Sequence, residues 1–398
     1  MSFITTFLGF LAEYKWVILF YLALILLVYF NRKRFEIQAK IIALYKTKIG
    51  IKFIDKLVKS REKLIRVLGI IGIFLGYIGI LVVFYLVLQL LVTMLKAPTV
   101  VRVGPVVPGA PIVGLGIKFP LIIGWISLLI IIIIHEASHG IVAKAFKQKI
   151  KSTGVAFFGP IPGAFVEIDE KKLQKEKDHV QCSVFAAGPN SNIITSIVFF
   201  LILSFLLAPA ADAMLSKGVK LTVNPGLPAE MSGLRNGDII VMIDNTSITT
   251  PNDFKYLGVI QPNTTHVFYT ADGRVIPVTA RENPENKSIG QFGVNIEKAD
   301  LKNPTLGNKI IFQILMWLVE LFFWLAFIGF NIGLINFLPL FITDGARILQ
   351  VLFNRLIKNK NFAKQLWLFI NKLTVLIFIL LIVIPIITNS INYIRAVI

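Results

Sequence analysis

The sequence predicts a polytopic α-helical membrane protein with about six transmembrane helices and one small inserted α+β domain. Of its 398 residues, 56% are hydrophobic, and the mean hydropathy is +0.76. Soluble domains are usually about 45–50% apolar. The apolar residues here are concentrated in runs long enough to cross a bilayer, which takes about 20 residues. Between two of these runs lies a polar segment, residues 210–309, with the alternating pattern typical of strands.

The six apolar runs divide the chain. The first run has no small-residue cleavage site and is followed by further spans, so we expect a retained helix and not a signal peptide. The expected spans are 9–30, 67–95, 119–145, 183–209, 310–335 and 366–388. The expected parts are two N-terminal helices with a basic loop, a first half of a membrane core, the inserted domain, a second half of the core and a C-terminal helix, at 1–96, 97–209, 210–309, 310–365 and 366–398.

The distribution of charge predicts the orientation in the membrane. The formal net charge is +19, and residues 32–66 hold twelve Lys/Arg against three Asp/Glu. Such an excess is typical of a cytoplasmic loop. Both termini and segment 210–309, where basic and acidic residues balance, then lie outside the cytoplasm. Because the basic residues stand between spans, they indicate contact with membrane lipid and not with nucleic acid. We expect a multi-pass protein of a cell membrane.

Segment 210–309 has the features of a small folded domain. The run FYTADGRVIPV places an Asp-Gly turn between two strand-like flanks, which predicts a β-hairpin. The run LPAEMSGLRNG predicts a short helix ended by glycine. The string PGLPAEMSGLRNGDIIVMID resembles the PDZ family. That resemblance implies binding of a peptide terminus, because such domains add a peptide as a strand to a sheet edge. A domain that acts only as a steric plug is the alternative.

Two apolar stretches, 97–120 and 154–168, are crowded with proline and glycine and cannot each form one helix. Irregular backbone is not tolerated in lipid, so each stretch must lie against protein or line a wet cavity. Both are candidate re-entrant loops. Ordinary interfacial loops are the alternative, more so for the first stretch.

The third expected span contains the sequence IIIIIHEASHG at residues 130–140. His135 and His139 are four residues apart and share one helix face, so both rings can meet one ion. Glu136 points aside, where it can hold a water molecule. Each ionisable group in an apolar span costs about 2.5–3.5 kcal/mol on insertion scales. Three such groups together therefore predict a metal site.

A catalytic zinc ion has three protein ligands and one open position. We expect the two other histidines, His179 and His266, to be solvated, and the single cysteine, Cys182, to be an apolar packing residue. The third ligand is therefore expected to be a carboxylate. The candidates in or beside spans are Glu13, Glu167, Glu320 and Asp344.

Depth in the membrane favours Asp344. His135 lies nine residues before Lys144, so it is about 13 Å from the cytoplasmic end of its span. Asp344 enters from that same side, on a segment broken by Pro339 and Gly345. A broken helix can turn a carboxylate inward where a regular helix would continue past.

The two motifs together resemble those of the site-2 protease family of intramembrane zinc metalloproteases. That family pairs HExxH, present here as HEASH, with N-x-x-P-x-x-x-x-D-G. The second motif is matched in NFLPLFITDG by Asn336, Pro339, Asp344 and Gly345. Thr343 departs slightly from the pattern, because many members carry an apolar residue there.

Further segments extend the resemblance over residues 119 to 350. The family has a glycine-proline-asparagine signature in the span between the motifs, and AAGPNSN supplies Gly188, Pro189 and Asn192. PGAFVEIDE resembles the family's membrane-associated β-loop, and a PDZ-like insert is a common variant. The compact size and the resemblance indicate a prokaryotic cell membrane, with an organelle membrane still open.

The resemblance implies one Zn²⁺ per chain and a role for each motif residue. His135, His139 and Asp344 would be the ligands, and Glu136 would be the base. Asn336 would face the scissile carbonyl, or else form a helix–helix hydrogen bond. We expect Gly163 and Phe165 of the β-loop to contact the substrate. We expect Asn192 to hold neighbouring backbone or, more simply, to form a helix–helix hydrogen bond. Residues expected to support the site structurally are Gly188, Pro189, Asn192, Pro339 and Gly345.

The resulting functional prediction is an intramembrane zinc metalloprotease. It would hydrolyse a peptide bond within or near the transmembrane segment of a membrane protein, after another protease has trimmed the outer part of that substrate. A divalent metal transporter is the main alternative, since buried His and Asp residues also line ion paths. It does not explain Glu136 or the inserted domain. A membrane-anchored protease with a water-facing site is opposed by the isoleucines, and a scaffold with a non-catalytic zinc is a remote fourth alternative.

Overall fold

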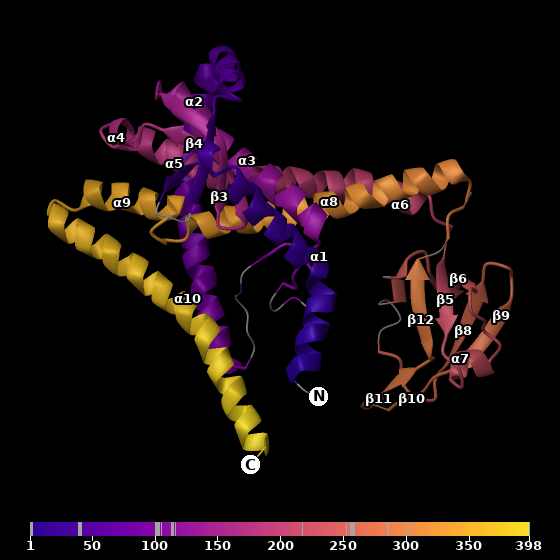
Figure 1. The fold of residues 1–398 in the computed structure, drawn as a ribbon. Coiled ribbons are helices and arrows are strands. Elements are labelled where there is room, and N and C mark those ends of the chain that lie inside the picture. The colour runs from indigo at the N-terminus through magenta and orange to yellow at the C-terminus, as the bar shows by residue number, and fades with distance from the viewer. Residues whose placement is uncertain are drawn as a thin grey trace. The chain divides into compact units, whose positions relative to one another are not determined.

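The protein folds into two compact units. The computed structural model describes residues 3–397, except 39–41, 100–103, 105, 113, 114, 116, 217, 252, 255–258, 285, 299 and 303. One unit comprises residues 1–201 and 320–398, and the other comprises residues 202–319. Figure 1 shows the chain; within the second unit the short helix α7 (Pro228–Met231) lies at one end of the strands.

Six helical segments in the described chain are long and apolar enough to cross a membrane, which confirms the predicted class of fold. The fourth segment continues from α5 through a π-helical turn, η2 (Leu203–Leu207), into α6 (Ala208–Ala213). The helices that carry the six segments are α1 (Phe3–Phe30), α2 (Ile51–Lys96), α3 (Leu121–Ala145), α5 (Asp178–Ile202), α8 (Leu306–Phe337) and α10 (Lys360–Val397). The first unit also has the shorter helices η1 (Arg32–Arg34), α4 (Glu170–Leu173) and α9 (Asp344–Leu356).

Helix α2 begins 16 residues earlier than the apolar pattern predicts, at Ile51 instead of residue 67. Its charged first part is nevertheless helical because one face is apolar. Ile54 and Val58 are buried on that face against Ala145 and Ile150. The backbone leaves helical geometry at Arg61, with φ −138° and ψ 25°, which marks a kink between this part and the span.

Glycines on α2 allow close packing of the membrane helices. Gly69, Gly72, Gly76 and Gly79 are all buried. The carbonyl of Gly72 accepts a hydrogen bond from Asn190 Nδ2 at 2.8 Å, and the Phe337 ring covers Gly79, where a methyl group would lie 2.5 Å from it. Small residues of this kind let helix backbones approach closely.

The first unit also contains a four-stranded antiparallel sheet in the order β1-β2-β3-β4. Its strands are β1 (Glu36–Gln38), β2 (Ile42–Thr47), β3 (Ile150–Phe158) and β4 (Ile161–Ile168). Strands β3 and β4 form a hairpin, as expected of a β-loop, with one register shift between Ile150 and Ser152. A re-entrant position for segment 154–168 stays a prediction. Strands β1 and β2 come from the basic segment after α1, where no strand was expected. Gly154 on β3 permits the pairing, because a methyl group there would collide with the Tyr45 carbonyl oxygen.

Segment 97–120 lies partly outside the described residues. Its described part includes a tight turn, in which Gly109 N donates to Phe119 O at 2.8 Å and Ile112 N donates to Ile117 O at 2.9 Å. The Phe119 ring is fully buried, 4.7 Å from the Trp324 ring centroid. A re-entrant position for this segment stays a prediction.

The second unit contains a six-stranded antiparallel sheet in the order β12-β5-β6-β8-β9, with β7 paired to β6. Its core includes the fully buried side chains Leu221, Ile240 and Phe268. The predicted hairpin is confirmed as β8–β9, turning at Gly273 with φ +87°, and the predicted short helix is α7. The strands are β5 (Val219–Val223), β6 (Ile239–Ile243), β7 (Thr246–Ser247), β8 (Thr265–Thr270), β9 (Val275–Thr279) and β12 (Val294–Lys298), with a separate ribbon of β10 (Arg281–Asn283) and β11 (Asn286–Gln291).

One expectation for this unit is wrong. His266 is not simply solvated, because its Nδ1 lies 2.7 Å from Asp244 Oδ2 and its ring packs edge-on against Phe292. The resemblance of the unit to PDZ domains stays a prediction.

Candidate metal centre

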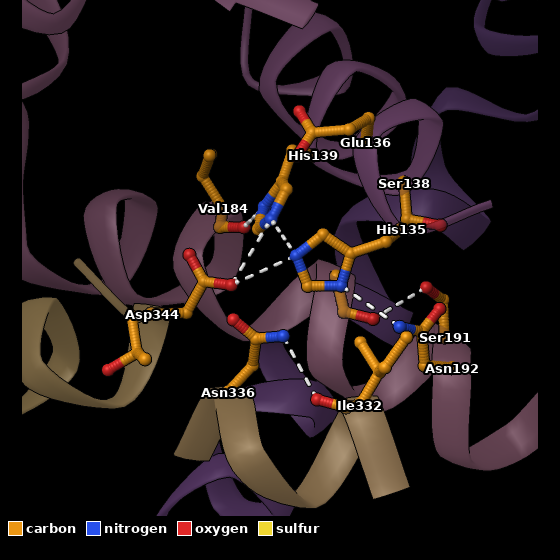
Figure 2. A network of polar contacts seen from close by, with 12 residues as sticks. His135, Glu136, Ser138, His139, Val184, Ser191, Asn192, Ile332, Asn336 and Asp344 are labelled. Carbon is orange, nitrogen blue, oxygen red and sulfur yellow. Dashed lines mark hydrogen bonds and ion pairs between the residues drawn. The ribbon is translucent and has the colours of Figure 1, made fainter. Parts of the chain in front are cut away.

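Two histidines of α3 point their ring nitrogens toward the same place. His135 and His139 are 8% and 9% exposed, and their Nε2 atoms are 3.2 Å apart. The helix consists mainly of apolar residues, which are stable only when buried or in lipid. The two histidines are four residues apart, so both rings lie on one face of the helix. Figure 2 shows the two rings converging on one point.

A break between two helices brings Asp344 to the same point. Helix α8 ends at Phe337, and α9 begins at Asp344. Between them the Thr343 hydroxyl lies 2.5 Å from Leu338 O and 2.8 Å from Leu340 O, so it closes the connecting loop. The threonine that departs from the family pattern therefore ties down the segment that presents the carboxylate.

Pro339 and Gly345 lie at this break between the helices. Pro339 lies in the connecting loop, where its missing N–H breaks no helix. Gly345 lets the start of α9 approach the end of α8, because a methyl group there would lie 2.5 Å from the carbonyl carbon of Phe337.

The three side chains form a nearly equilateral triangle. Asp344 Oδ2 is 3.3 Å from His135 Nε2 and 3.3 Å from His139 Nε2. In a tetrahedral zinc site with bonds of about 2.0 Å, neighbouring ligand atoms are about 3.3 Å apart. The residues therefore fit zinc in donor chemistry and in spacing. In the described part of the chain, this is the one group of three His, Cys, Asp or Glu side chains whose ligand atoms come together.

Gly188 of α5 keeps this point open. A methyl group at Gly188 would lie 2.7 Å from His135 Nε2 and would collide with His139 Nε2. The next residue, Pro189, is a proline inside α5, where it removes one helical N–H donor. The glycine and proline of the sequence signature therefore lie directly beside the three candidate ligands.

Helix α5 also contacts the far side of each imidazole. His139 Nδ1 lies 2.7 Å from the Val184 carbonyl oxygen. His135 Nδ1 lies 3.2 Å from Asn192 Nδ2. Of the two expectations for Asn192, the contact between helices is the one present, because its side chain faces the ring of a histidine on α3 and not neighbouring backbone. Val184, Gly188 and Asn192 are spaced four residues apart, so they share one face of α5.

The surroundings of Asp344 favour the ionised form of its carboxylate. Burial raises the pKa of Asp344, but the two adjacent imidazoles lower it by more, so the pKa lies below the ordinary range. An ionised carboxylate is the form that binds a metal ion.

Glu136 lies beside the triangle and not in it. Its Oε2 accepts a hydrogen bond of 3.2 Å from Val166 N on β4. Gly140 lets β4 approach α3, because a methyl group there would lie 3.0 Å from Val166 Cγ1. Glu136 therefore stands between the two histidines and the sheet, on the wall of a cavity of about 630 Å³.

Asn336 lines the same cavity. Its Nδ2 donates to Ile332 O on its own helix at 2.9 Å, and its amide stands next to Asp344 (Figure 2). Among the described residues, the hydrogen bond of the Asn336 side chain stays within its own helix and does not reach another helix.

Glu167 is held by partners other than the histidines. Ser152 Oγ donates to Glu167 Oε2 at 2.5 Å, and Lys46 Nζ lies 3.2 Å from the same oxygen. The hydrogen bond from Ser152 lowers the pKa of Glu167 most; burial raises the pKa in part, and Lys46 lowers it further, so that it lies below the ordinary value. The negative charge of Glu167 is therefore already paired with Lys46 of the same sheet.

The last residues of β4, the second strand of the β-loop, reach the cavity. Val166, Glu167 and Ile168 line the cavity, whereas Gly163 and Phe165 are not among the lining residues. Substrate contact by Gly163 and Phe165 stays a prediction. Two contacting residues could not be predicted from the sequence: Val184, which acts through a carbonyl that every residue has, and Lys46, which lies on an unexpected strand.

Comparison with known proteins gives the family. The family model described as Peptidase family M50 matches residues 123–380, which include both motifs. The chain belongs to peptidase family M50. A family M50 peptidase with six candidate membrane spans is an intramembrane zinc metalloprotease of the site-2 type. The family match favours peptidase activity over metal transport.

Two known proteins are similar in sequence to this chain. An uncharacterised protein of Methanocaldococcus jannaschii is 29% identical over 351 residues, covering 84% of this chain and 85% of the relative. Zinc metalloprotease RasP of Oceanobacillus iheyensis is 28% identical over 216 residues, covering 42% of this chain and 49% of RasP.

Proposed function

We propose that His135, His139 and Asp344 hold one Zn²⁺ and that Glu136 is the general base for hydrolysis of a peptide bond within or near a substrate's transmembrane segment. The observation that carries this proposal is the triangle of ligand atoms with edges of 3.2–3.3 Å, with a carboxylate beside it on the cavity wall. Each element of the triangle comes from the family motifs, and the spacing suits zinc without rearrangement.

Each group of the site would have a separate role in hydrolysis. Bound zinc would polarise the scissile carbonyl and lower the pKa of the attacking water. Glu136 takes the proton of that water and later delivers it to the leaving amine. One amide hydrogen of Asn336 is used by Ile332 O. Its second hydrogen remains available for the oxyanion.

Water reaches the site from the cytoplasm in this proposal. The cavity wall carries charged residues, including Lys151, Glu170 and Arg347. A second polar cavity of about 600 Å³ shares Glu170 and Arg347 with the first, and these two residues form an ion pair at 3.1 Å where the cavities meet. By the positive-inside rule, this basic side is cytoplasmic. The two termini and segment 210–309 are then extracytoplasmic, and the zinc site is nearer the cytoplasm.

The free edge of β4 is suited to hold an unwound substrate segment. The Val166 N–H bonds to Glu136, so it points away from β3. Alternate residues of a strand point their backbone groups to the same side. Pro162 and Ala164 therefore also face this edge, where a proline costs no sheet hydrogen bond. A substrate strand added here would pass beside Glu136, with Ala164 as a backbone donor.

Replacing Ala164 with proline tests this edge. The change removes the outward N–H but no bond to β3, so we expect kcat/KM for a single-span substrate to fall about 3- to 10-fold, as for one lost hydrogen bond. The zinc content should not change. Ala164→Ser keeps the N–H and should cleave as the unchanged protein does. Equal cleavage by the proline and serine variants would remove β4 as the substrate edge.

The second unit offers a site for the trimmed end of a substrate. β12 is at one end of the six-stranded sheet and pairs with β5. Addition of a peptide to such an edge is the general mode of PDZ-like domains. We propose that this unit binds a peptide terminus released when another protease cuts the outer part of the substrate.

The ligand set and the reaction are tested together. Asp344→Ala and Glu167→Gln both remove a carboxylate from the cavity wall. The protein is reconstituted in vesicles with a labelled single-span substrate, and bound zinc and cleavage are measured. We expect Asp344→Ala to lose zinc and cleavage, and Glu167→Gln to retain one zinc per chain and most of the cleavage. Zinc flux without cleavage by the unchanged protein across varied substrates would support transport instead.

A further inference from the structure

The Asn192 side chain is in an unusual position for a buried amide. It is 0% exposed, and its Nδ2 lies 3.2 Å from His135 Nδ1. Its Oδ1 is buried and has no hydrogen-bond partner among the described residues. Leaving a buried polar atom unpaired costs about 1–3 kcal/mol. A buried amide with one orphaned atom and one atom against a metal-ligand candidate indicates a function beyond packing.

The chemistry of imidazole decides which amide atom belongs at His135. If His135 Nε2 binds a metal ion, its lone pair is used there, and the ring hydrogen must sit on Nδ1. An Nδ1–H group needs an acceptor opposite, and an amide nitrogen is a donor. The nitrogen and oxygen of an amide are nearly alike in size and are assigned from their surroundings. Rotating the Asn192 amide by half a turn puts Oδ1 opposite Nδ1, and Oδ1 has no other contact to lose.

We infer that Asn192 is a positioning residue that accepts the Nδ1 hydrogen of His135 and so holds its Nε2 lone pair toward the metal. The inference rests on the proposed ligand role of His135. Asn192 does not touch the substrate or the reacting atoms in this assignment. It fixes the tautomer and the ring orientation of one ligand.

The second histidine has the same arrangement with a different acceptor. His139 Nδ1 lies 2.7 Å from the Val184 carbonyl oxygen, which is always an acceptor. Asn192 lies two turns further along the same face of α5, opposite the other histidine, and Gly188 lies midway under both Nε2 atoms. One face of α5 therefore supplies a hydrogen-bond acceptor to each imidazole and leaves space between them. A side-chain acceptor is needed at 192 because, among the described residues, the contact of His135 Nδ1 is the Asn192 amide and not a backbone carbonyl.

The test compares two substitutions of nearly equal size. Asn192→Leu removes the acceptor, whereas Asn192→Asp keeps one. Zinc affinity is measured by competition with a chelator, and the visible absorption of the Co²⁺-loaded protein reports the geometry of the site. Loss of a partner to a ligand histidine typically weakens metal binding about 10- to 100-fold. We expect that loss for Asn192→Leu with an altered Co²⁺ spectrum, and we expect Asn192→Asp to stay within about threefold of the unchanged protein.

Asn190 provides a matched control. It is a buried asparagine on the same helix, and its Nδ2 donates to Gly72 O at 2.8 Å, away from the histidines. Asn190→Leu should lower the thermal unfolding temperature of the metal-free protein without changing zinc affinity. Equal zinc affinities for Asn192→Leu and the unchanged protein, or equal losses for the leucine variants at 190 and 192, would overturn the inference. A His139→Ala variant distinguishes the two levels: if its zinc affinity equals that of the unchanged protein, the proposed metal centre itself is wrong.

Discussion

Replacing Glu136 with glutamine is expected to abolish cleavage while zinc stays bound. Glutamine has nearly the same shape, and its amide oxygen can still accept the hydrogen bond from Val166 N. It cannot take a proton from water or return one to the leaving amine. General acid–base catalysis contributes about 10²- to 10⁴-fold, so cleavage should fall by that factor. Cleavage of a labelled single-span substrate in vesicles and bound zinc are the two measurements.

Glu167→Gln is the matched control for this experiment. Both residues line the same cavity, and both carboxylates lie near β4. The control should keep most of its activity, because Glu167 is paired with Ser152 and Lys46 and not with the reacting atoms. If Glu136→Gln lost zinc along with activity, Glu136 would be part of the metal centre and not the base. If it cleaved normally, another group would have to move the proton.

The second large effect is expected from a single added methyl group. Gly188→Ala places a carbon 2.7 Å from His135 Nε2 and against His139 Nε2, in the space between the candidate ligands. The rings would have to separate to make room, and the triangle would open. Zinc affinity should fall by more than the roughly 10- to 100-fold typical of a lost partner contact, and cleavage should be lost with it. Zinc content after dialysis against a weak chelator measures the effect.

Gly76→Ala controls for the general cost of a methyl group in the helix bundle. Gly76 is also buried on a membrane helix, but a methyl group there would lie 3.3 Å from Ala186 Cβ and further from its other neighbours. That change should leave one zinc per chain. Full zinc retention by Gly188→Ala would mean that the metal binds away from the point where the three side chains meet.

The helical period is what makes part of this site predictable. His135, Glu136 and His139 lie on one continuous helix, where spacing alone fixes which side chains share a face. Asp344 is harder, because depth and a broken helix only narrow the choice among carboxylates. The structure adds the reason for the choice, since Thr343 and Gly345 shape the turn that presents the carboxylate.

Other contacts could not be predicted because the residues involved carry no distinctive signal. The acceptor for His139 is the carbonyl of Val184, and every residue has a carbonyl. The contact of Asn192 with His135 depends on how two helices are placed against each other, which spacing along one helix does not fix. Strands β1 and β2 are short and lie in a basic segment, where charge outweighs the alternating pattern.

Strands β1 and β2 also indicate which part of the chain is needed for the enzyme to fold. Every motif residue lies beyond the second helix, and the family match begins at residue 123. Yet β2 pairs along β3 from Ile42↔Phe158 to Thr47↔Thr153, and β3 in turn holds β4 beside Glu136. A polypeptide shortened to the motifs would leave β3 with an unpaired backbone edge, which invites association with other chains. The smallest folding unit of this peptidase is therefore larger than its motif-bearing part, and its N-terminal segment is a structural part of the enzyme.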